Sequence, residues 1–427
     1  MKRFATVFLT LLACALATRA QNHLQKGDFV AVCGDSITEQ KLYSVYIEDY
    51  LLMCKPQPDL RVMQFGWSGE TSWGFLSKMP NEALRFDMTV ATTCYGMNDG
   101  QYSPMNEQKA QKYRDAMQGI VSAFKQKGVR FIVVGSPGAV DTDTFKQPDP
   151  NDPEKDPRKK KRIPRADMYN PTLAALRDIA KDVAQKNGCA FANVHDTMID
   201  AMAKAKAKYG PQYHVAGGDG VHPQPNGQLC MAYAFLKGLG VDGNIGTITV
   251  DLSANKAQAT DGHKVLGMKD GEVEIESTRY PFCFYGDPKS PGATSGIIEF
   301  LPFNQDLNRY TLVVKGATGK VKVTWGKDSK EFAAADAEKG INLPAEFPTD
   351  NPFSEPFKRV EDVIKKQQNF ETPLVKKTLH DLPKAKDKEQ AERTAQDEIK
   401  RAKELFDDSQ RAAAAPVKHT IKIEIVK

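Results

Sequence analysis

The chain has 427 residues, of which 41% are hydrophobic and 26% charged, and this length suits two or three compact domains. Its seven cysteines are too few for a disulfide-built miniature scaffold, and its 31 glycines and 25 prolines follow no collagen-like period. The formal net charge is +5, but three positive charges lie in the first 20 residues and the rest of the chain carries only +2. Composition therefore gives no electrostatic argument for a nucleic-acid partner.

The first 20 residues have the pattern of a secretory signal peptide. Lys2 and Arg3 precede an apolar run from Phe4 to Ala17, and small residues follow it. A lipoprotein signal, with Cys14 as the lipid-attachment residue, is the less favoured alternative. No later run reaches the roughly 18 apolar residues that a membrane span needs. We therefore expect a secreted or periplasmic protein without a transmembrane segment.

Residues 27–240 alternate short apolar runs with segments of helical spacing. The runs predict strands at 29–33, 60–65, 88–92 and 130–134, and the spacing predicts helices over 42–53, 107–127 and 171–187. Alternation of this kind is typical of a parallel sheet covered by helices on both faces. Such sheets hold their active sites beyond the carboxyl ends of the strands.

Residues 141–167 interrupt the alternation. An acidic, proline-rich stretch from Asp141 to Asp156 precedes the basic run Arg158–Arg162. Because the segment directly follows the fourth predicted strand, we expect it at the same edge as the active site. A solvated loop is the favoured interpretation, and a lid or clamp for an anionic substrate is the alternative.

The pattern changes to period two after Gly240. Alternating residues predict half-buried antiparallel strands at 247–252, 310–314, 320–325 and 419–425, and amphipathic helices are predicted at 355–369 and 386–413. We therefore expect a β-sandwich-like accessory domain over 245–427, with a helical insertion at about 353–415. Tyr310 and Trp325 could stack on a glycan, but their place in alternating strands favours the core.

Three consecutive predicted strands are each followed by a segment of polar residues and glycine. Gly34–Glu39 follows the first strand, Gly66–Thr71 the second and Tyr95–Gly100 the third. The carboxyl ends of parallel strands share one edge, so these segments should lie together. Ser36 can point its hydroxyl into a cleft there, whereas a helix cap or a turn is the alternative for each segment taken alone.

A fourth segment, Gly218–Pro223, holds an acid and a base three residues apart. This spacing lets Asp219 accept a hydrogen bond from His222 Nδ1 and leaves Nε2 to take a proton from Ser36. A capping or core role is the alternative for a histidine beside proline. No G-x-S-x-G elbow occurs, which excludes an ordinary α/β-hydrolase.

The four segments together resemble the sequence blocks of the SGNH/GDSL hydrolase superfamily, of the secreted bacterial esterase type. The resemblance implies a flavodoxin-like three-layer α/β sandwich with a parallel sheet over residues 21–244. It also implies that Ser36 is the nucleophile, His222 the base and Asp219 the acid that orients it. The resemblance does not extend to residues 245–427.

The same resemblance assigns an oxyanion hole to the backbone N–H groups of Ser36 and Gly69 and to the side-chain amide of Asn98. Asp35, Trp67 and Asp99 are candidate substrate contacts. Trp67 departs from the family pattern, because smaller residues are usual before the glycine of the second block, and it could stack on a sugar ring.

The chemistry that the resemblance implies is ester hydrolysis through a covalent acyl-enzyme, with no metal and no cofactor. Export and an appended β-rich domain favour an extracellular polymer, and similar secreted members often remove acetyl groups from polysaccharides. We therefore expect an acetylated polysaccharide or oligosaccharide as the substrate. A lipid or lysophospholipid esterase is the main alternative, and a non-catalytic glycan-binding protein is the second.

Overall fold

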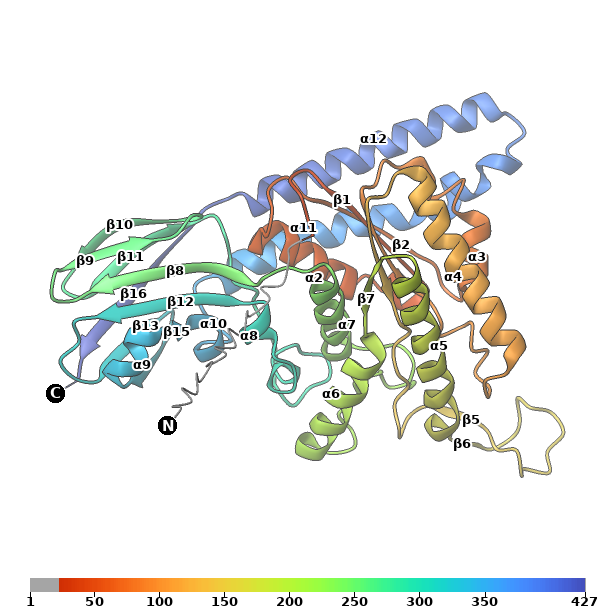
Figure 1. The fold of residues 1–427 in the computed structure, drawn as a ribbon, viewed down its shortest axis with the longest axis horizontal. Coiled ribbons are helices and arrows are strands. Elements are labelled where there is room, and N and C mark those ends of the chain that lie inside the picture. Colours follow the sequence, from red (N-terminus) through yellow and green to blue (C-terminus); the bar gives the residue numbers. More distant parts are fainter. Residues whose placement is uncertain (1–22, 427) are drawn as a thin grey trace, which may run out of the picture.

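The computed structural model describes residues 23–426, so the predicted signal peptide at 1–20 and Cys14 lie outside the described residues. The N-terminal part forms an α/β domain, and two further β-sheets lie at one end of it (Figure 1). No helix in this part of the chain is both long enough and apolar enough to cross a membrane.

The α/β domain is built on five parallel strands in the order β2-β1-β3-β4-β7. These strands are β1 (Phe29–Gly34), β2 (Arg61–Gly66), β3 (Val90–Cys94), β4 (Phe131–Gly135) and β7 (Ala190–Ala192). Every residue of β3 is buried, as expected for a strand covered on both faces. The four predicted strands are confirmed, and the short β7 extends the sheet beyond them.

Helices cover both faces of this sheet (Figure 1). The α3, α4 and α5 helices pack in a row on one face, whereas α2 and α7 lie against the other, with α6 beside α7. Their bounds are α1 (Ser36–Glu39), α2 (Tyr43–Asp49), α3 (Ser72–Lys78), α4 (Glu107–Lys127), α5 (Ala166–Lys186), α6 (Val194–Tyr209) and α7 (Pro225–Gly238). A π-helical turn, Tyr50–Cys54, continues α2.

The α5 helix begins five residues before its predicted start. It was expected from Pro171, but it starts at Ala166 and contains that proline. Tertiary contacts stabilise the added turn: Tyr169 is fully buried and its hydroxyl donates to the carbonyl of Met97. The side chain of Asn170 exchanges two hydrogen bonds with the backbone of Val140, at 2.9 and 3.0 Å.

Two sheets make up the β-rich end. One has the order β15-β12-β8-β9 and the other β10-β11-β16-β13-β14. The strands are β8 (Asn244–Asp251), β9 (Lys256–Ala259), β10 (His263–Lys269), β11 (Glu272–Ser277), β12 (Arg309–Lys315), β13 (Val321–Trp325), β14 (Asp328–Phe332), β15 (Ile341–Asn342) and β16 (Val417–Ile425). Short helices α8 (Phe303–Asp306), α9 (Ala334–Lys339) and α10 (Leu343–Glu346) connect or cover them.

The antiparallel prediction is wrong for one pair of these strands. β8 and β12 lie side by side in parallel, with Thr247 opposite Thr311. The intervening residues 252–308 are long enough to return the chain to the same end of the sheet, which a parallel pair requires. The prediction holds for β13 and β16, which are antiparallel neighbours.

The aromatic residues singled out in the β-rich end belong to its core. Tyr310 and Trp325 have no exposed surface, so neither offers a ring to a glycan. Next to them, the hydroxyl of Ser277 lies 2.8 Å from His263 Nδ1 and 3.1 Å from His419 Nε2. Burial lowers the pKa of His263 to about 4 and that of His419 to about 3, so both rings are neutral at pH 7.

The helical insertion packs mainly on the α/β domain, although Phe353 at its start contacts Tyr310, Trp325 and His419 of the flanking sheets. It comprises α11 (Ser354–Pro373), a π-helical turn (Leu374–Leu379) and α12 (Lys388–Ala413). α11 contacts α2 and the edge strand β2, and α12 runs alongside α11 over that domain before β16 returns to the second sheet (Figure 1).

The contact between α11 and α2 buries several carboxyl and amide groups. The Ser44 hydroxyl donates to Gln368 Oε1 at 2.7 Å, and the Gln368 amide donates to Glu48 Oε2 at 2.7 Å. Asp49 is equally buried, but among the described residues neither of its carboxyl oxygens has a hydrogen-bond partner. Burial, reinforced by the charge of Glu361, raises the pKa of Asp49 well above its usual value.

We predict that Asp49→Asn makes stability less sensitive to pH. A carboxyl with a raised pKa keeps its proton in the folded state, whereas it ionises near pH 4 when unfolded. Stability is therefore lost as pH rises from about 4 towards the folded pKa, and the neutral amide removes this contribution. Urea unfolding at pH 5 and pH 8 should show a smaller loss for Asp49→Asn than for the wild type. Asp397→Asn, on the exposed face of α12, should behave as wild type.

Candidate active site

The three residues predicted to carry the chemistry form one hydrogen-bonded series. Ser36 Oγ lies 2.9 Å from His222 Nε2, and His222 Nδ1 lies 2.7 Å from Asp219 Oδ2. Ser36 is the first residue of α1, directly beyond β1, and Asp219 and His222 lie in the loop that precedes α7. The fold thus brings together residues 186 positions apart, with the imidazole between the hydroxyl and the carboxylate.

The turn that carries the acid and the base is fixed by its own backbone. Asp219 Oδ1 accepts hydrogen bonds from the N–H groups of Val221 and His222, both at 2.9 Å. Partial burial raises the pKa of Asp219, but these bonds and the His222 ring outweigh it and hold the pKa below its usual value. Asp219 is therefore ionised at neutral pH and accepts from His222 Nδ1.

Gly69 lies in the loop after β2, and hydrogen bonds fix the residue on each side of it. Gly69 has φ +73°, is exposed, and its N–H donates to no other described residue. On one side, Glu39 Oε2 accepts from both the N–H and the hydroxyl of Ser68 at 2.5 Å. On the other, Asn98 Nδ2 donates to the carbonyl of Glu70 at 2.9 Å. Asn98 has two amide hydrogens, so one remains for a ligand.

Two of the candidate substrate contacts are buried beneath the site. Asp35 is 3% exposed and caps α1 by accepting from the N–H of Ile37 at 2.9 Å. Asp99 is 1% exposed and accepts from the N–H groups of Ser72 and Gly96 at 2.9 and 3.0 Å. Burial raises the pKa of Asp35 to about 7 and that of Asp99 to about 6. Both carboxyl groups support the loops around Ser36.

Trp67 lies among protein side chains. Its ring centroid is 3.5 Å from Lys78 Nζ, 5.0 Å from Lys376 Nζ and 4.9 Å from the centroid of the His380 ring. These contacts place the indole between α3 and the helical insertion, and they occupy ring surface that a sugar would need.

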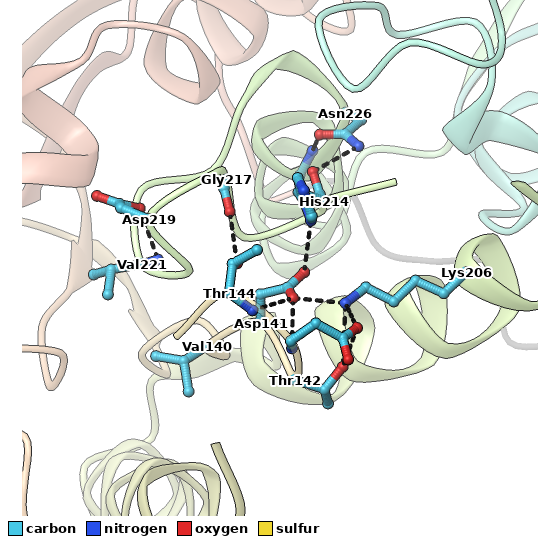
Figure 2. Close-up of polar contacts among 12 residues, drawn as sticks. Val140, Asp141, Thr142, Thr144, Lys206, His214, Gly217, Asp219, Val221 and Asn226 are labelled. Carbon is cyan, nitrogen blue, oxygen red and sulfur yellow. Dashed lines mark hydrogen bonds and ion pairs between the residues drawn. The ribbon is translucent and has the colours of Figure 1, made fainter. Parts of the chain in front are cut away.

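A buried acid, Asp141, lies next to the loop that contains Gly217, Asp219 and Val221 (Figure 2). Asp141 has no exposed surface, its N–H donates to the carbonyl of Gly220 at 2.9 Å, and its Oδ1 accepts from Lys206 Nζ at 2.6 Å. His214 Nδ1 lies 3.9 Å from the other oxygen, Oδ2. The hydroxyl of Thr144 donates to the carbonyl of Gly217 at 3.1 Å. The first residues of the charged loop, Asp141 and Thr144, thus hold the backbone of the loop that contains Asp219 and His222.

The outer part of the charged loop folds on itself. It forms a two-stranded hairpin of β5 (Lys146–Pro148) and β6 (Arg162–Pro164), which projects from the α/β domain (Figure 1). Two of its basic residues contact groups of the same hairpin: Arg158 pairs with Asp156 at 3.0 Å, and Arg162 donates to the Lys146 carbonyl at 2.6 Å.

Several residues that shape the site were not found by reading the sequence. Glu39 belongs to the first sequence block. Its hydrogen bonds with Ser68, however, form only because β1 and β2 are neighbouring strands of the sheet. Tyr102 donates to Asn98 Oδ1 at 3.2 Å, and its ring stacks on Tyr169. Lys376 reaches the site from the far end of the chain. No motif includes Lys376, and the third block ends before Tyr102.

A parallel sheet with a serine, a histidine and an aspartate in series at its carboxyl edge is the architecture of a serine hydrolase. Among the described residues, no group of three or more His, Cys, Asp or Glu side chains could hold a metal ion. The model of the GDSL-like lipase/acylhydrolase family matches residues 32–229. This match covers most of the α/β domain, and it identifies the protein as a serine carboxylic ester hydrolase.

Solved structures resemble this chain at low sequence identity. One, described as a gut microbial diltiazem-metabolizing enzyme, is 20% identical, with a TM-score of 0.69 over 94% of this chain and 98% of its own. An acetylxylan esterase from Geobacillus stearothermophilus is 20% identical, with a TM-score of 0.39 over 51% of this chain and 95% of its own. The first likeness shows that the fold of nearly the whole chain occurs elsewhere. No curated protein sequence matches the chain.

We predict that Gly220→Ala disturbs the turn that carries Asp219 and His222. Gly220 has φ +79°, and an added Cβ would lie 2.3 Å from the backbone nitrogen of Phe145. The substitution should cost more than about 1 kcal/mol in unfolding free energy and should lower esterase activity. Gly218→Ala is the matched control, because a Cβ there meets nothing within 4 Å. Equal behaviour of the two variants in urea unfolding and activity assays would contradict this account of the turn.

Proposed function

We propose that the protein is a secreted serine esterase that removes acetyl groups from a carbohydrate. The observation that carries the catalytic part is the series from Ser36 Oγ through the His222 imidazole to Asp219, with distances of 2.9 and 2.7 Å. We assign the nucleophile to Ser36, the base to His222 and the orienting acid to Asp219.

In the proposed mechanism, Ser36 Oγ attacks the ester carbonyl carbon while His222 Nε2 takes the hydroxyl proton. The ionised Asp219 stabilises the imidazolium that forms. The tetrahedral oxyanion is held by the N–H groups of Ser36 and Gly69 and by the free amide hydrogen of Asn98. The imidazolium then protonates the leaving alcohol, and a water molecule, activated in the same way by His222, releases the acid and restores Ser36.

The surroundings of Ser36 favour a small acyl group on a hydroxyl-rich leaving group. Ser68, Gly69 and Asp219 are exposed near the nucleophile, and Asn98 is half-buried there. Polar groups of this kind hydrogen-bond to sugar hydroxyls more readily than they bind a long acyl chain. The substrate class that we propose is therefore an acetylated polysaccharide or oligosaccharide.

The lipid-esterase alternative needs an apolar cleft beside Ser36. A cavity of about 360 Å³ with both apolar and charged lining residues does exist, and Phe29, Phe86 and Phe406 contribute to it, but neither Ser36 nor His222 lines it. The proposal of secretion rests on the N-terminal sequence pattern alone.

We predict that Ser36→Ala lowers kcat on acetyl esters by about 10⁴-fold or more, since the acyl-enzyme cannot form without the nucleophile. Release of acetate from acetylated xylan, acetylated oligosaccharides and 4-nitrophenyl esters of increasing chain length would measure both the reaction and the acyl preference. Ser77→Ala, a serine exposed on α3, is the matched control and should retain full activity.

Two results would count against parts of this proposal. Equal turnover by wild type and Ser36→Ala would remove the catalytic assignment. Faster hydrolysis of long-chain than of acetyl esters would keep the catalytic residues but would replace the carbohydrate substrate with a lipid.

A further inference from the structure

The segment that follows α11 lies against the loop that presents Gly69. Lys376 and His380, in and just after the π-helical turn, both contact the Trp67 ring at the start of that loop. His380 Nδ1 also lies 2.9 Å from Glu82 Oε1. This segment is outside the residues that the family model matches. The C-terminal part of the chain therefore reaches the site that the α/β domain builds.

Glu39 connects this segment to the site. It stands on the four-residue helix α1 that begins with Ser36, and its two carboxyl oxygens have different partners. One oxygen, Oε2, accepts from the N–H and hydroxyl of Ser68, and the other, Oε1, accepts from Lys376 Nζ at 2.7 Å. Both side chains of the ion pair are largely buried, with 24% of Lys376 and 20% of Glu39 exposed. A pair that is sheltered from water in this way is screened less than a surface pair.

We infer that Lys376 is a positioning residue for the oxyanion hole. It holds Glu39 at Oε1, so that Oε2 stays on Ser68 and the next residue, Gly69, keeps its N–H directed at the substrate carbonyl. The inference rests on the proposed function, because it concerns the oxyanion that forms when Ser36 attacks. It also assigns a role to the helical insertion, which supplies part of the frame of the active site.

The consequence of losing Lys376 follows from this geometry. Without the ammonium group, the half-buried Glu39 carboxylate keeps Ser68 as its hydrogen-bond partner but loses its ion pair. The charge of Lys41, which donates to the Glu39 carbonyl and not to its carboxylate, then remains nearby. Rotation of the Glu39 carboxylate towards solvent would free Ser68 and widen the range of positions of the Gly69 N–H. A donor that is displaced stabilises the transition state less, whereas ground-state binding of the ester depends on it little.

The test compares Lys376→Gln with Lys377→Gln in the full chain, using 4-nitrophenyl acetate as the substrate. Lys377 is the adjacent, exposed residue of the same turn and serves as the matched control. Lys376→Gln should lower kcat by about 10-fold and leave KM within about twofold. Lys376→Arg should restore most of the loss, because a guanidinium can still donate to Glu39. Binding of phenylboronic acid, which mimics the tetrahedral state on Ser36, should weaken in parallel with kcat/KM.

A double-mutant cycle keeps the inference testable even if Lys376→Gln is less stable. Ser68→Ala removes one of the two bonds to Glu39 from the other end, without touching the ion pair. If Lys376 acts through Glu39 on Ser68, the double variant should lose less kcat than the product of the two single losses. A double loss equal to that product would overturn the inference, as would wild-type kcat in Lys376→Gln. Both results are separate from a failure of the proposed function, which would appear as full activity in Ser36→Ala.

Discussion

The parallel alignment of β1, β2 and β3 is the constraint on which the rest of the structure depends. Because these strands point the same way, the segments that leave their carboxyl ends meet at one edge of the sheet. Ser36 starts the segment after β1, Gly69 lies in the segment after β2 and Asn98 in the segment after β3. His222 then needs only a loop before α7 to complete the series, although it lies 186 residues from Ser36.

Hydrogen bonds between these three segments fix their positions relative to one another. Glu39 joins the first segment to the second through Ser68, and Asn98 joins the third to the second through the carbonyl of Glu70. Gly69, between these two anchors, can adopt its positive φ without a steric penalty. The loop that contains Gly69 is therefore held at the residues on each side of it.

The sequence predicts the parts of this arrangement that local patterns encode. Continuous apolar runs identify four of the five strands of the parallel sheet, and the blocks around Ser36 and His222 contain the residues that the fold brings into one hydrogen-bonded series. Patterns do not encode how distant elements pack, so the parallel pairing of β8 with β12 and the early start of α5 at Ala166 were missed. Lys376 could not be predicted either, because 337 residues separate it from its partner Glu39.

The pKa values of the carboxyl groups near Ser36 separate their roles. Asp219 accepts two backbone N–H bonds besides the His222 ring, and these bonds keep its pKa low, so it is a charged partner for imidazolium across the neutral range. Asp35 is buried next to the charge of Asp99, and with a pKa of about 7 it is about half protonated at neutral pH. The carboxylate that lies against the His222 ring is the one that hydrogen bonds keep ionised, whereas the one that caps α1 tolerates a proton because Ile37 N–H needs only one acceptor oxygen. Environment, and not residue type, therefore decides which aspartate serves the imidazole.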